Sequence, residues 1–429
     1  MSRVHLIGIG GAGVSALARV FLSRGDQVSG CDARESATTG GLAAAGARIW
    51  TGHDPAHVAG AGVVVYSGAT SATAAPELEA ARAAGARVLS RAEMLAELIA
   101  ESTSITVAGT HGKTTVTFML GHLLTCAGWD PTVLVGDGSS SRVGRSGWLV
   151  AEADESDGSL ALHRPQHGIL TSVEFDHPDH FASLDDVDEL FRRHLAAIPG
   201  VSVVCADYPR AAAMRAAGTK VTYGFASEAD YQVRGDGEVR RRGHRLAALR
   251  LGVPGRHNLQ NATGALAMAV ELGVEPDAAA DALTTYPGAH RRLERLGSWR
   301  GAELYDDYGH HPTKVRATLA AARELGGRRL VLVFQPHRFT RVGALRDEFA
   351  ESLRGADEVV VTEIYGAGEP NPQGLSGREL ADRVPGARFA PDLDGARRLL
   401  EDLVRDGDLV LLMGAGDIWK LGDELAHAG

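Results

Sequence analysis

Short runs of β-branched and other apolar residues alternate with Ala- and Leu-rich stretches of helical spacing along the whole chain. A run such as 63–66, apolar throughout, is typical of a strand that is buried on both faces. Strands that alternate with helices are the pattern of parallel α/β sheets. The sequence therefore predicts an α/β protein, and it contains no internal repeat.

The expected elements fall into three blocks. In the first block we predict a helix over 14–24 and strands at 4–7, 27–31, 63–66 and 86–89. In the second we predict an antiparallel excursion around 231–250, helices over 259–271 and 277–284, and strands at 105–108, 148–151, 168–171 and 201–205. In the third we predict strands at 303–305, 329–334, 357–362 and 408–413.

Two breaks in this pattern indicate domain boundaries. The first block ends before the strand at 105, and the turn Tyr286-Pro287-Gly288, followed by a charged run at 291–295, ends the second. We therefore predict three domains over residues 1–101, 102–289 and 290–429. The number suits a chain of 429 residues, because single cores rarely grow beyond about 250–300 residues.

Composition excludes several classes of protein. No uncharged apolar run approaches the roughly 20 residues that span a bilayer, and the first residues lack a signal-peptide pattern. The net charge of −10 argues against nucleic acid as a partner. The three cysteines (Cys31, Cys126 and Cys205) have no paired spacing, which predicts neither a disulfide nor a zinc framework. We expect a soluble, cytoplasmic protein with no membrane partner.

Residues 109–115, Gly-Thr-His-Gly-Lys-Thr-Thr, lie between a predicted strand and a predicted helix. In this arrangement backbone N–H groups and a helix N-terminus bind a polyphosphate. Lys113 would reach the terminal phosphates, and the Thr114 hydroxyl would reach a magnesium ion. The strict nucleotide-loop pattern requires glycine at position 107, which is Val107 here. The loop is therefore a variant that needs support from the rest of the chain to indicate ATP.

A second glycine loop, residues 8–13, follows the first predicted strand and opens the first helix. With Asp32 near the end of the second strand, it has the placement of a dinucleotide-binding fingerprint. A helix N-terminus binds a diphosphate whatever the diphosphate joins. The loop by itself fits NAD, a UDP-sugar, or glycines that serve only helix–strand packing.

Acidic residues and histidines follow two predicted strands of the second block. Glu152 is the first carboxylate of the octet 150–157, at the carboxyl end of a strand parallel to the phosphate-loop strand. That end faces a bound nucleotide, and magnesium prefers hard oxygen ligands. His177, in the segment 174–180, is the second expected metal ligand, ahead of His180. A solvated acidic loop is the alternative reading of the octet.

Polar clusters also follow strands of the third block, at residues 306–312 and 334–341. The arginines of the second cluster are suited to forked contacts with carboxylate or phosphate. At the start of the helix predicted over 259–271, either Asn258 or His257 caps the helix or reaches the edge of an adenine.

In their order and spacing these segments resemble the Mur ligases of bacterial cell-wall synthesis, and the resemblance covers nearly the whole chain. The matching segments are 8–15, 109–115, 152–158, 255–261, 306–312 and 334–341. The resemblance implies an N-terminal Rossmann-like domain for a UDP-sugar, a central P-loop ATPase with a mainly parallel sheet, and a C-terminal Rossmann-like domain that admits an amino acid.

The implied activity is ATP-dependent ligation in peptidoglycan precursor synthesis. An acyl phosphate would link the lactyl carboxylate of UDP-N-acetylmuramate to L-alanine, with two Mg²⁺ ions bound and Mn²⁺ as a substitute. Ser156 and the residues after Phe334 favour alanine over a recycled peptide. We expect a monomer or a weak homodimer.

Roles carried over from the family fall on matching positions. The implied phosphate loop is Gly109, Thr110, His111, Gly112, Lys113, Thr114 and Thr115. The implied metal ligands are Thr114, Glu152 and His177. Further ATP contacts fall on Asn258, Arg292 and Asp306. The acceptor and acyl-phosphate site comprises Tyr308, His310, Arg338 and Arg341. Catalysis is assigned to Lys113, Glu152, His177, His310 and Arg338. The UDP-sugar contacts are Gly8, Gly10, Gly11, Gly13, Ser15, Asp32 and Ser67.

Three departures from the family pattern leave alternatives open. Ser172 stands where the family usually has asparagine, Pro178 follows His177, and the segment 136–147 is short and rich in serine and arginine. A divergent paralogue that attaches a recycled peptide or another amino acid fits these features, as does a nucleotide-gated regulatory protein without catalysis. The second phosphate loop argues against the remaining alternative, a nicotinamide-dependent dehydrogenase.

Overall fold

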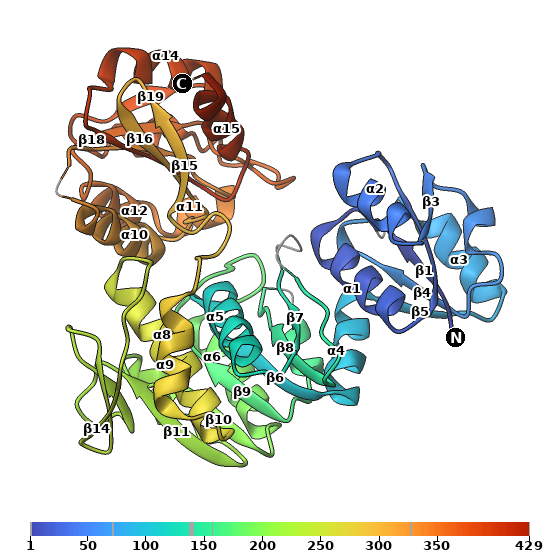
Figure 1. Cartoon of the computed structure of the whole chain (residues 1–429). Coiled ribbons are helices and arrows are strands. Elements are labelled where there is room, and N and C mark those ends of the chain that lie inside the picture. The colour runs from blue at the N-terminus through green and yellow to red at the C-terminus, as the bar shows by residue number, and fades with distance from the viewer. Residues whose placement is uncertain (1, 71–72, 137–140, 157, 327, 429) are drawn as a thin grey trace.

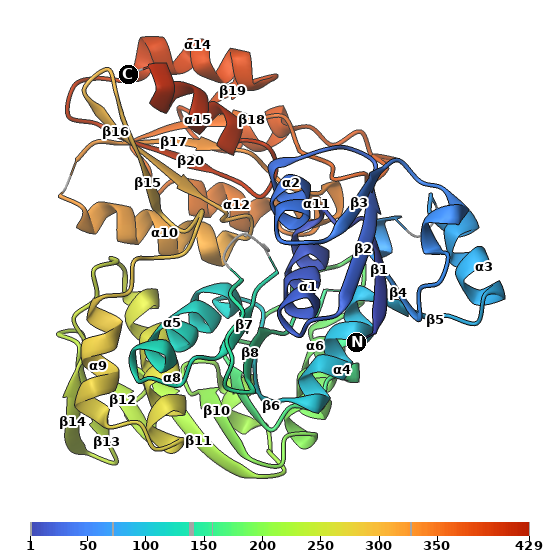
Figure 2. The same cartoon turned by 45° about the vertical axis from the view of Figure 1, so that its right-hand side comes forward.

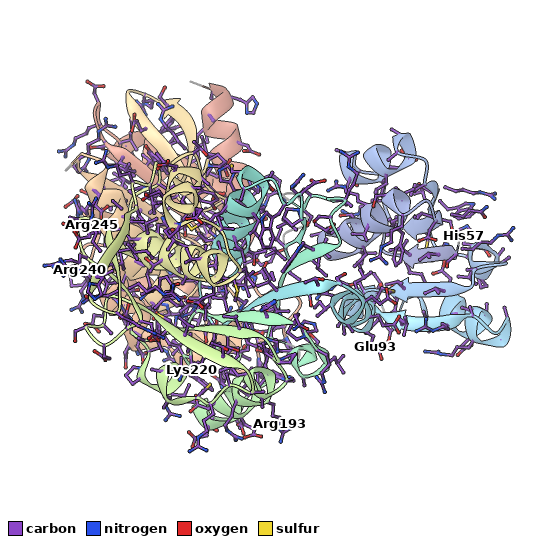
Figure 3. All side chains as sticks on the ribbon, turned by 60° about the horizontal axis from the view of Figure 1, so that its bottom comes forward. His57, Glu93, Arg193, Lys220, Arg240 and Arg245 are labelled. Atoms are coloured by element: carbon purple, nitrogen blue, oxygen red, sulfur yellow. The ribbon has the colours of Figure 1, made fainter. Side chains whose placement is uncertain are left out.

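The structure, a computed structural model, describes residues 2–70, 73–136, 141–156, 158–326 and 328–428. It contains three sheets, each within its own α/β domain, which confirms the predicted fold class. The C-terminal domain lies against the central domain (Figures 1 and 2). The N-terminal domain projects to one side and joins the central domain through α4 (Arg91–Glu101) (Figure 3).

The N-terminal domain has a parallel five-stranded sheet of order β3-β2-β1-β4-β5. Its strands are β1 (Arg3–Ile7), β2 (Gln27–Asp32), β3 (Arg48–Thr51), β4 (Val63–Tyr66) and β5 (Arg87–Ser90). Its helices are α1 (Ala12–Ser23), α2 (Ala37–Ala44), α3 (Ala75–Ala83) and α4, with short 3₁₀ turns η1 (Pro55–Val58) and η2 (Gly68–Thr70). Ser90 and Glu93 form a capping box that starts α4 directly after β5.

The central domain has a nine-stranded sheet of order β14-β13-β12-β11-β10-β9-β6-β8-β7. The strands are β6 (Thr103–Ala108), β7 (Thr132–Leu134), β8 (Trp148–Glu152), β9 (His167–Leu170), β10 (Val201–Cys205), β11 (Thr219–Gly224), β12 (Tyr231–Val233), β13 (Glu238–Arg241) and β14 (His244–Ala248). The last three pair antiparallel, as predicted, and the others are parallel. The helical segments are α5 (Lys113–Cys126), η3 (Ser159–Leu162), α6 (Leu184–Ala196), α7 (Pro209–Ala213), α8 (Arg256–Glu271) and α9 (Pro276–Thr284).

The C-terminal domain has a six-stranded sheet of order β15-β16-β20-β17-β18-β19, in which the β15–β16 pair is antiparallel. The strands are β15 (Glu294–Trp299), β16 (Ala302–Asp307), β17 (Leu330–Phe334), β18 (Glu358–Thr362), β19 (Arg388–Ala390) and β20 (Leu409–Met413). The helices are α10 (Pro312–Glu324), α11 (Phe339–Ala344), α12 (Arg346–Leu353), α13 (Gly377–Ala381), α14 (Leu393–Leu403) and α15 (Trp419–Ala428).

Every strand predicted from an apolar run is present, but the sequence missed β3, β7, β11, β15 and β19. β7 and β19 are three-residue edge strands, and β3 is a four-residue edge strand without a fully buried residue. The charged run at 291–295, read as a boundary, continues into the edge strand β15, in which only Trp299 is buried. None of the described helices is long and apolar enough to cross a membrane.

Two helical glycines differ in the space around them, which gives a test of the packing. A Cβ at Gly121 in α5 would lie 2.5 Å from Val133 Cγ2 in β7, whereas nothing lies within 4 Å of one at Gly40 in α2. Gly121→Ala is expected to lower the free energy of unfolding by about 1–3 kcal/mol because it overpacks the core. Gly40→Ala is expected to raise it by about 0.5–1 kcal/mol through helix propensity.

Thermal unfolding of both variants, followed by circular dichroism, measures the two effects against the unchanged protein. The packing of α5 on β7 is wrong if Gly121→Ala melts at or above the temperature of Gly40→Ala.

Candidate active site

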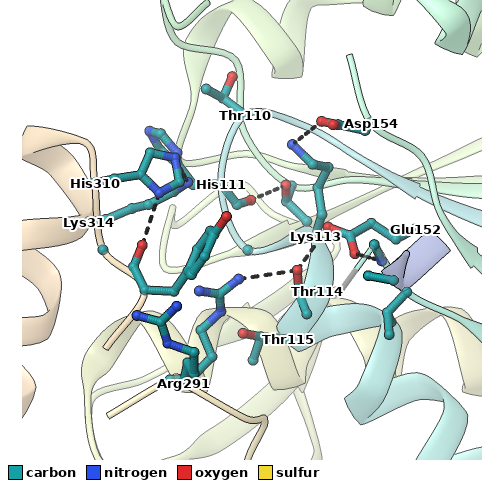
Figure 4. Close-up of a pocket in the computed structure, with 18 of the residues that line it drawn as sticks. Thr110, His111, Lys113, Thr114, Thr115, Glu152, Asp154, Arg291, His310 and Lys314 are labelled. Atoms are coloured by element: carbon teal, nitrogen blue, oxygen red, sulfur yellow. Dashed lines mark hydrogen bonds and ion pairs between the residues drawn. The ribbon is translucent and has the colours of Figure 1, made fainter. Parts of the chain in front are cut away.

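The phosphate loop connects β6 to α5 and depends on two glycines. Gly109 has a φ of +128° and Gly112 a φ of +82°, which favour glycine. A Cβ at Gly109 would lie 2.2 Å from Thr171 Oγ1, and one at Gly112 would lie 2.7 Å from Asn261 Oδ1. The helix α5 begins at Lys113 immediately after the loop, so its N-terminus faces the same cavity as the loop (Figure 4).

Ser172, the departure from the family pattern, holds this loop from the neighbouring strand end. The His111 N–H donates to Ser172 Oγ at 2.8 Å, and the Thr110 N–H donates to the Ser172 carbonyl at 3.1 Å. Thr171 Oγ1 also donates to the carbonyls of Ala108 and His111. The serine is therefore compatible with an ordered phosphate loop.

Lys113 is held by two carboxylates that follow β8. Its Nζ lies 2.6 Å from Glu155 Oε2 and 3.3 Å from Asp154 Oδ1. Burial lowers the pKa of Lys113, but the carboxylates of Glu155, Asp154 and Glu152 outweigh burial and raise it above its ordinary value. Burial raises the pKa of Glu155 to about 7, against the opposing effect of Lys113. Lys113 therefore remains charged beside the phosphate loop.

The three predicted metal ligands lie in two adjacent groups. Thr114 Oγ1 donates to Glu152 Oε1 at 2.8 Å, and Glu152 Oε2 accepts from the Gly136 N–H at 2.8 Å. His177 instead lies with Asp154 and Glu155, two carboxylates that were not predicted as metal ligands. Ligand atoms of these three side chains lie within 4.8 Å of one another.

The donor chemistry of these groups fits a divalent cation. Carboxylate and hydroxyl oxygens suit magnesium, and a single imidazole also suits manganese. His177 Nδ1 is buried and has no hydrogen-bond partner among the described residues. His177 has a φ of +57°, an uncommon conformation for a residue other than glycine. The strained backbone holds this ring beside Asp154.

Residues that precede β15 and follow β16 bring the C-terminal domain to the phosphate loop. Arg292 Nη2 donates to Thr114 Oγ1 at 3.3 Å, and its guanidinium lies 5.0 Å from the centre of the Tyr308 ring. Thr313 Oγ1 donates to Glu174 Oε2 at 2.7 Å, and the same carboxylate oxygen lies 3.0 Å from His111 Nε2. The phosphate loop of the central domain is therefore also in contact with the C-terminal domain.

Lys314 was not predicted and lies opposite Lys113 (Figure 4). Its Nζ donates to His310 Nε2 at 3.3 Å, and His310 Nδ1 donates to the Tyr308 carbonyl at 2.9 Å. Among the described residues no carboxylate lies within ion-pair distance of Lys314. Burial, together with repulsion from Lys113 and other cations, lowers the pKa of Lys314 to about 8 although Asp176 opposes the change.

Two ion pairs of unequal burial link α11 and its N-cap to the segment after β9. Arg341 Nε lies 2.7 Å from Asp176 Oδ1, and both side chains are 2% exposed. Arg338 Nη1 lies 2.6 Å from Asp179 Oδ2, and these side chains are 32% and 34% exposed. Although burial alone would raise it, Arg341 and His177 hold the pKa of Asp176 well below its usual value. Asp176 is therefore ionised and paired.

One cavity of about 900 Å³ brings residues of all three domains together. Most predicted site residues line it: Gly11, Gly13, Ser67, Thr110, His111, Gly112, Lys113, Thr114, Thr115, Glu152, His177, Asn258, Arg292, Tyr308, His310, Arg338 and Arg341. The remaining predicted residues do not line it: Gly8, Gly10, Ser15, Asp32, Gly109 and Asp306.

The residues outside the cavity wall have structural partners. Asp32 Oδ2 accepts from the Gly10 N–H at 2.9 Å and thereby shapes the first glycine loop. Ser15 Oγ donates to the Ala12 carbonyl within α1. Asp306 pairs with Arg291, whose Nε lies 2.7 Å from Asp306 Oδ2. These contacts show what each side chain does in the protein without ligand.

Asn258 and His257 both line the cavity, but neither caps α8. The helix begins at Arg256, with Gly255 at its N-cap and no side-chain cap, so the capping alternative is wrong. Asn258 Nδ2 donates to the Pro254 carbonyl at 2.6 Å. Residues 137–140, part of the short segment 136–147 that is rich in serine and arginine, lie outside the described residues.

Some site residues that were not predicted nevertheless have a recognisable pattern in the sequence. Asp154 and Glu155 belong to the acidic octet, but the first carboxylate was preferred because it leaves the strand first. Lys314 is four residues after His310, a spacing that brings side chains together at the start of a helix. That these side chains point into the cavity depends on how the domains pack, which cannot be read from the sequence.

The two interdomain ion pairs offer a matched test. Asp176→Asn leaves Arg341 buried without a counter-charge and is expected to destabilise the protein by about 3–5 kcal/mol. Asp179→Asn removes an ion pair that water already screens, so it is expected to lower the free energy of unfolding by less than about 1 kcal/mol. Calorimetric melting, with small-angle X-ray scattering to follow separation of the domains, distinguishes the two variants. Equal effects would show that the Arg341 pair does not hold the domains together.

Comparisons with known proteins agree with this arrangement. Residues 3–103 match the sequence model of the Mur ligase family catalytic domain, 107–269 that of the Mur ligase middle domain, and 291–416 that of the Mur ligase glutamate ligase domain. The UDP-N-acetylmuramate–L-alanine ligase of Solidesulfovibrio magneticus is 42% identical over 98% of this chain and 96% of its own. The enzyme of that name from Kineococcus radiotolerans is 44% identical over 100% and 96%.

Solved structures are similar over the full length. The UDP-N-acetylmuramate-alanine ligase of Thermotoga maritima superposes with a TM-score of 0.83 at 27% identity, covering 100% of this chain and 99% of its own. A murein peptide ligase from Psychrobacter arcticus has a TM-score of 0.72 at 27% identity, covering 100% and 98%. The three domains, the phosphate loop and the relatives together show that this chain belongs to the Mur ligase family.

Proposed function

We propose that this protein is an ATP-dependent ligase that joins L-alanine to the lactyl carboxylate of UDP-N-acetylmuramate, in peptidoglycan precursor synthesis. The observation that carries the proposal is a single cavity lined by a phosphate loop, a second glycine loop and the strand ends of a third domain. Relatives that bear this activity in their names are at least 40% identical over nearly the whole chain. We also propose domain boundaries at 101/102 and 289/290.

The proposed reaction has two steps. A carboxylate oxygen of the sugar attacks the γ-phosphorus of ATP, the bond to the β-phosphate oxygen breaks, and ADP leaves. The neutral amine of alanine then attacks the acyl carbon, and inorganic phosphate departs as the amide forms and the amine proton is lost. Both steps bring anions together, so positioning and charge neutralisation provide most of the catalysis.

The central domain would hold ATP and its metal ions. When ATP binds, Lys113 would exchange its contact with Glu155 for one with the terminal phosphates. Lys113 is the first residue of α5 and therefore lies beside the phosphate loop. Thr114, Glu152 and His177 would bind one or two Mg²⁺ ions, which neutralise phosphate charge when bound. Asn258, Arg292 and Asp306 are proposed to contact the adenine, phosphates and ribose. For Asp306, such a contact requires release from Arg291.

The other two domains would hold the reacting groups. In the C-terminal domain Tyr308, His310, Arg338 and Arg341 surround the position proposed for the acyl phosphate and the incoming amino acid. In the N-terminal domain the loop 8–13, together with Ser67, would bind the UDP diphosphate through backbone N–H groups. Ser15 and Asp32 would support that loop. We expect a cytoplasmic monomer or weak homodimer.

The experiment that tests the function is phosphate release from Mg-ATP in the presence of UDP-N-acetylmuramate. The acceptors to compare are L-alanine, glycine, L-serine and the tripeptide L-alanyl-γ-D-glutamyl-meso-diaminopimelate, with the product identified by mass. Release that requires the sugar and yields the L-alanyl product is expected. A tripeptide product would instead assign the activity named for a murein peptide ligase, and no release with any acceptor would contradict ligase function.

Lys113→Ala is expected to abolish ATP turnover while binding of UDP-N-acetylmuramate, measured by calorimetry, survives. The lysine is the proposed phosphate contact, and the sugar binds to another domain. Lys420→Ala, at an exposed position on α15, is the control and is expected to turn over ATP normally. Near-normal turnover by Lys113→Ala would refute the phosphate-loop assignment.

Lys314 is expected to contribute a positive charge beside the acyl phosphate. Its pKa is lowered to about 8, so kcat/KM for UDP-N-acetylmuramate should fall as pH rises through about 8 and the ammonium deprotonates. Lys314→Arg should remove this decline because a guanidinium stays charged. Lys314→Met should lower kcat/KM about 100-fold below pH 8. A decline that persists in both variants would assign it to another group.

A further inference from the structure

Five side chains of types that can bind a metal ion lie together in the N-terminal domain, away from the active-site cavity. His5 lies on β1, Cys31 on β2 and Glu77 on α3, while His53 and His57 come from the segment between β3 and the end of η1. His5 and Cys31 are fully buried and Glu77 is 1% exposed. His57 lies on the part of this domain most distant from the other two domains (Figure 3). None of these residues lines the active-site cavity.

The spacing of the donor atoms matches that of a metal site. Donor atoms of His5, Cys31 and Glu77 all lie within 4.8 Å of one another. Cys31 Sγ is 3.2 Å from Glu77 Oε1 and 3.6 Å from His53 Nδ1, which is itself 2.8 Å from Glu77 Oε2. A tetrahedral zinc ion has ligand atoms about 3.3–3.8 Å apart. To close around an ion, Glu77 would move slightly away from His53 and Cys31, and His5 would complete the set from within 4.8 Å of Cys31 and Glu77.

The histidines provide a second, independent observation. His5 Nδ1 lies 3.0 Å from Ser29 Oγ, and Ser29 Oγ donates to the Val4 carbonyl at 3.5 Å. In the tautomer in which His5 Nδ1 donates to Ser29 Oγ, the lone pair is on Nε2. That Nε2 is buried and has no hydrogen-bond partner among the described residues; His57 Nδ1 also makes no hydrogen bond but lies 3.6 Å from Glu77 Oε1. Such orphan nitrogens in a buried site are costly unless something binds them.

We propose that this cluster binds one Zn²⁺ ion through His5 Nε2, Cys31 Sγ, His53 and Glu77. Imidazole, thiolate and carboxylate donors in a closed site are the set that zinc accepts, and one thiolate disfavours magnesium. Binding requires loss of the Cys31 proton to solvent, and the charges of the thiolate and of Glu77 then balance the ion. Two hydrogen bonds from outside the set orient the ligands. Ser29 Oγ contacts His5 Nδ1, and the Asp54 N–H donates to Glu77 Oε1.

The proposed ion would stabilise the first glycine loop. The Cys31 carbonyl accepts from the N–H groups of Gly8 and Ile9, at 2.8 and 3.1 Å. Asp32, the next residue, accepts from Gly10. An ion that fixes Cys31 therefore fixes the backbone that presents the loop. The sequence shows no zinc framework here because the proposed ligands come from four separate segments without a short spacing.

Cobalt titration of the full-length, reduced protein tests the proposal. Co²⁺ replaces Zn²⁺ in tetrahedral sites, and a thiolate ligand gives a sulfur-to-cobalt absorption that oxygen and nitrogen ligands do not. Wild-type protein is expected to show this absorption at one ion per chain, and Zn²⁺ is expected to bleach it. Ions bound at the active site do not contribute, because that set has no cysteine. Absence of the absorption in the wild type overturns the proposal.

Two variants assign the signal to its residues. Cys31→Ser should abolish the absorption, whereas Cys126→Ser, at an exposed cysteine of the central domain, should retain it. Should Cys31→Ser not fold, His53→Gln serves in its place and should weaken cobalt binding roughly tenfold or more. Zn²⁺ should also raise the melting temperature of wild type and of Cys126→Ser. Absorption that survives Cys31→Ser, or cobalt affinity unchanged by His53→Gln, would contradict the assignment.

Discussion

The buried ion pair between Arg341 and Asp176 is the contact on which the active-site cavity depends. It joins α11 of the C-terminal domain to the segment after β9, and neither side chain is more than 2% exposed. A buried charge is tolerated only when its partner is present, so the pair aligns the two domains in one arrangement. Two residues with positive φ, His177 and Arg338, lie in the same interface. Their strain persists because the surrounding contacts hold them.

Charge balance is the second constraint on this site. The reacting groups are anions, and the cavity presents Lys113, Lys314, Arg292 and Arg341 to them. In the protein without ligand, Glu155 and Asp154 neutralise Lys113 and Asp176 neutralises Arg341. Lys314 is different, because burial and neighbouring cations lower its pKa. The cations are thus already in place, and binding exchanges some carboxylate partners for phosphates.

The chain's local features were predictable to different extents. Both glycine loops and the polar clusters after the strands were recognised, because parallel strands place their carboxyl ends at one edge of a sheet. The short edge strands β3, β7 and β19 were missed, since so few residues show no periodicity. Of the two roles left open for Asn258 and His257, the cap of α8 is wrong, because Gly255 takes the N-cap position. Glu152 lies beside Thr114, the other metal ligand expected from the central strands, whereas the neighbouring Glu155 and Asp154 pair with Lys113.

The sequence by itself determined the α/β class, the core strands, the loop that follows each strand and the family. All of these depend on residues that are neighbours along the chain: periodic burial, glycines in turns and motifs of fixed spacing. Only the tertiary structure decided that Arg341 meets Asp176 from 165 residues away, that Lys314 faces Lys113, and that His5, Cys31 and Glu77 share one buried site. Such contacts depend on how sheets and domains pack, and the spacing of residues along the chain does not encode them.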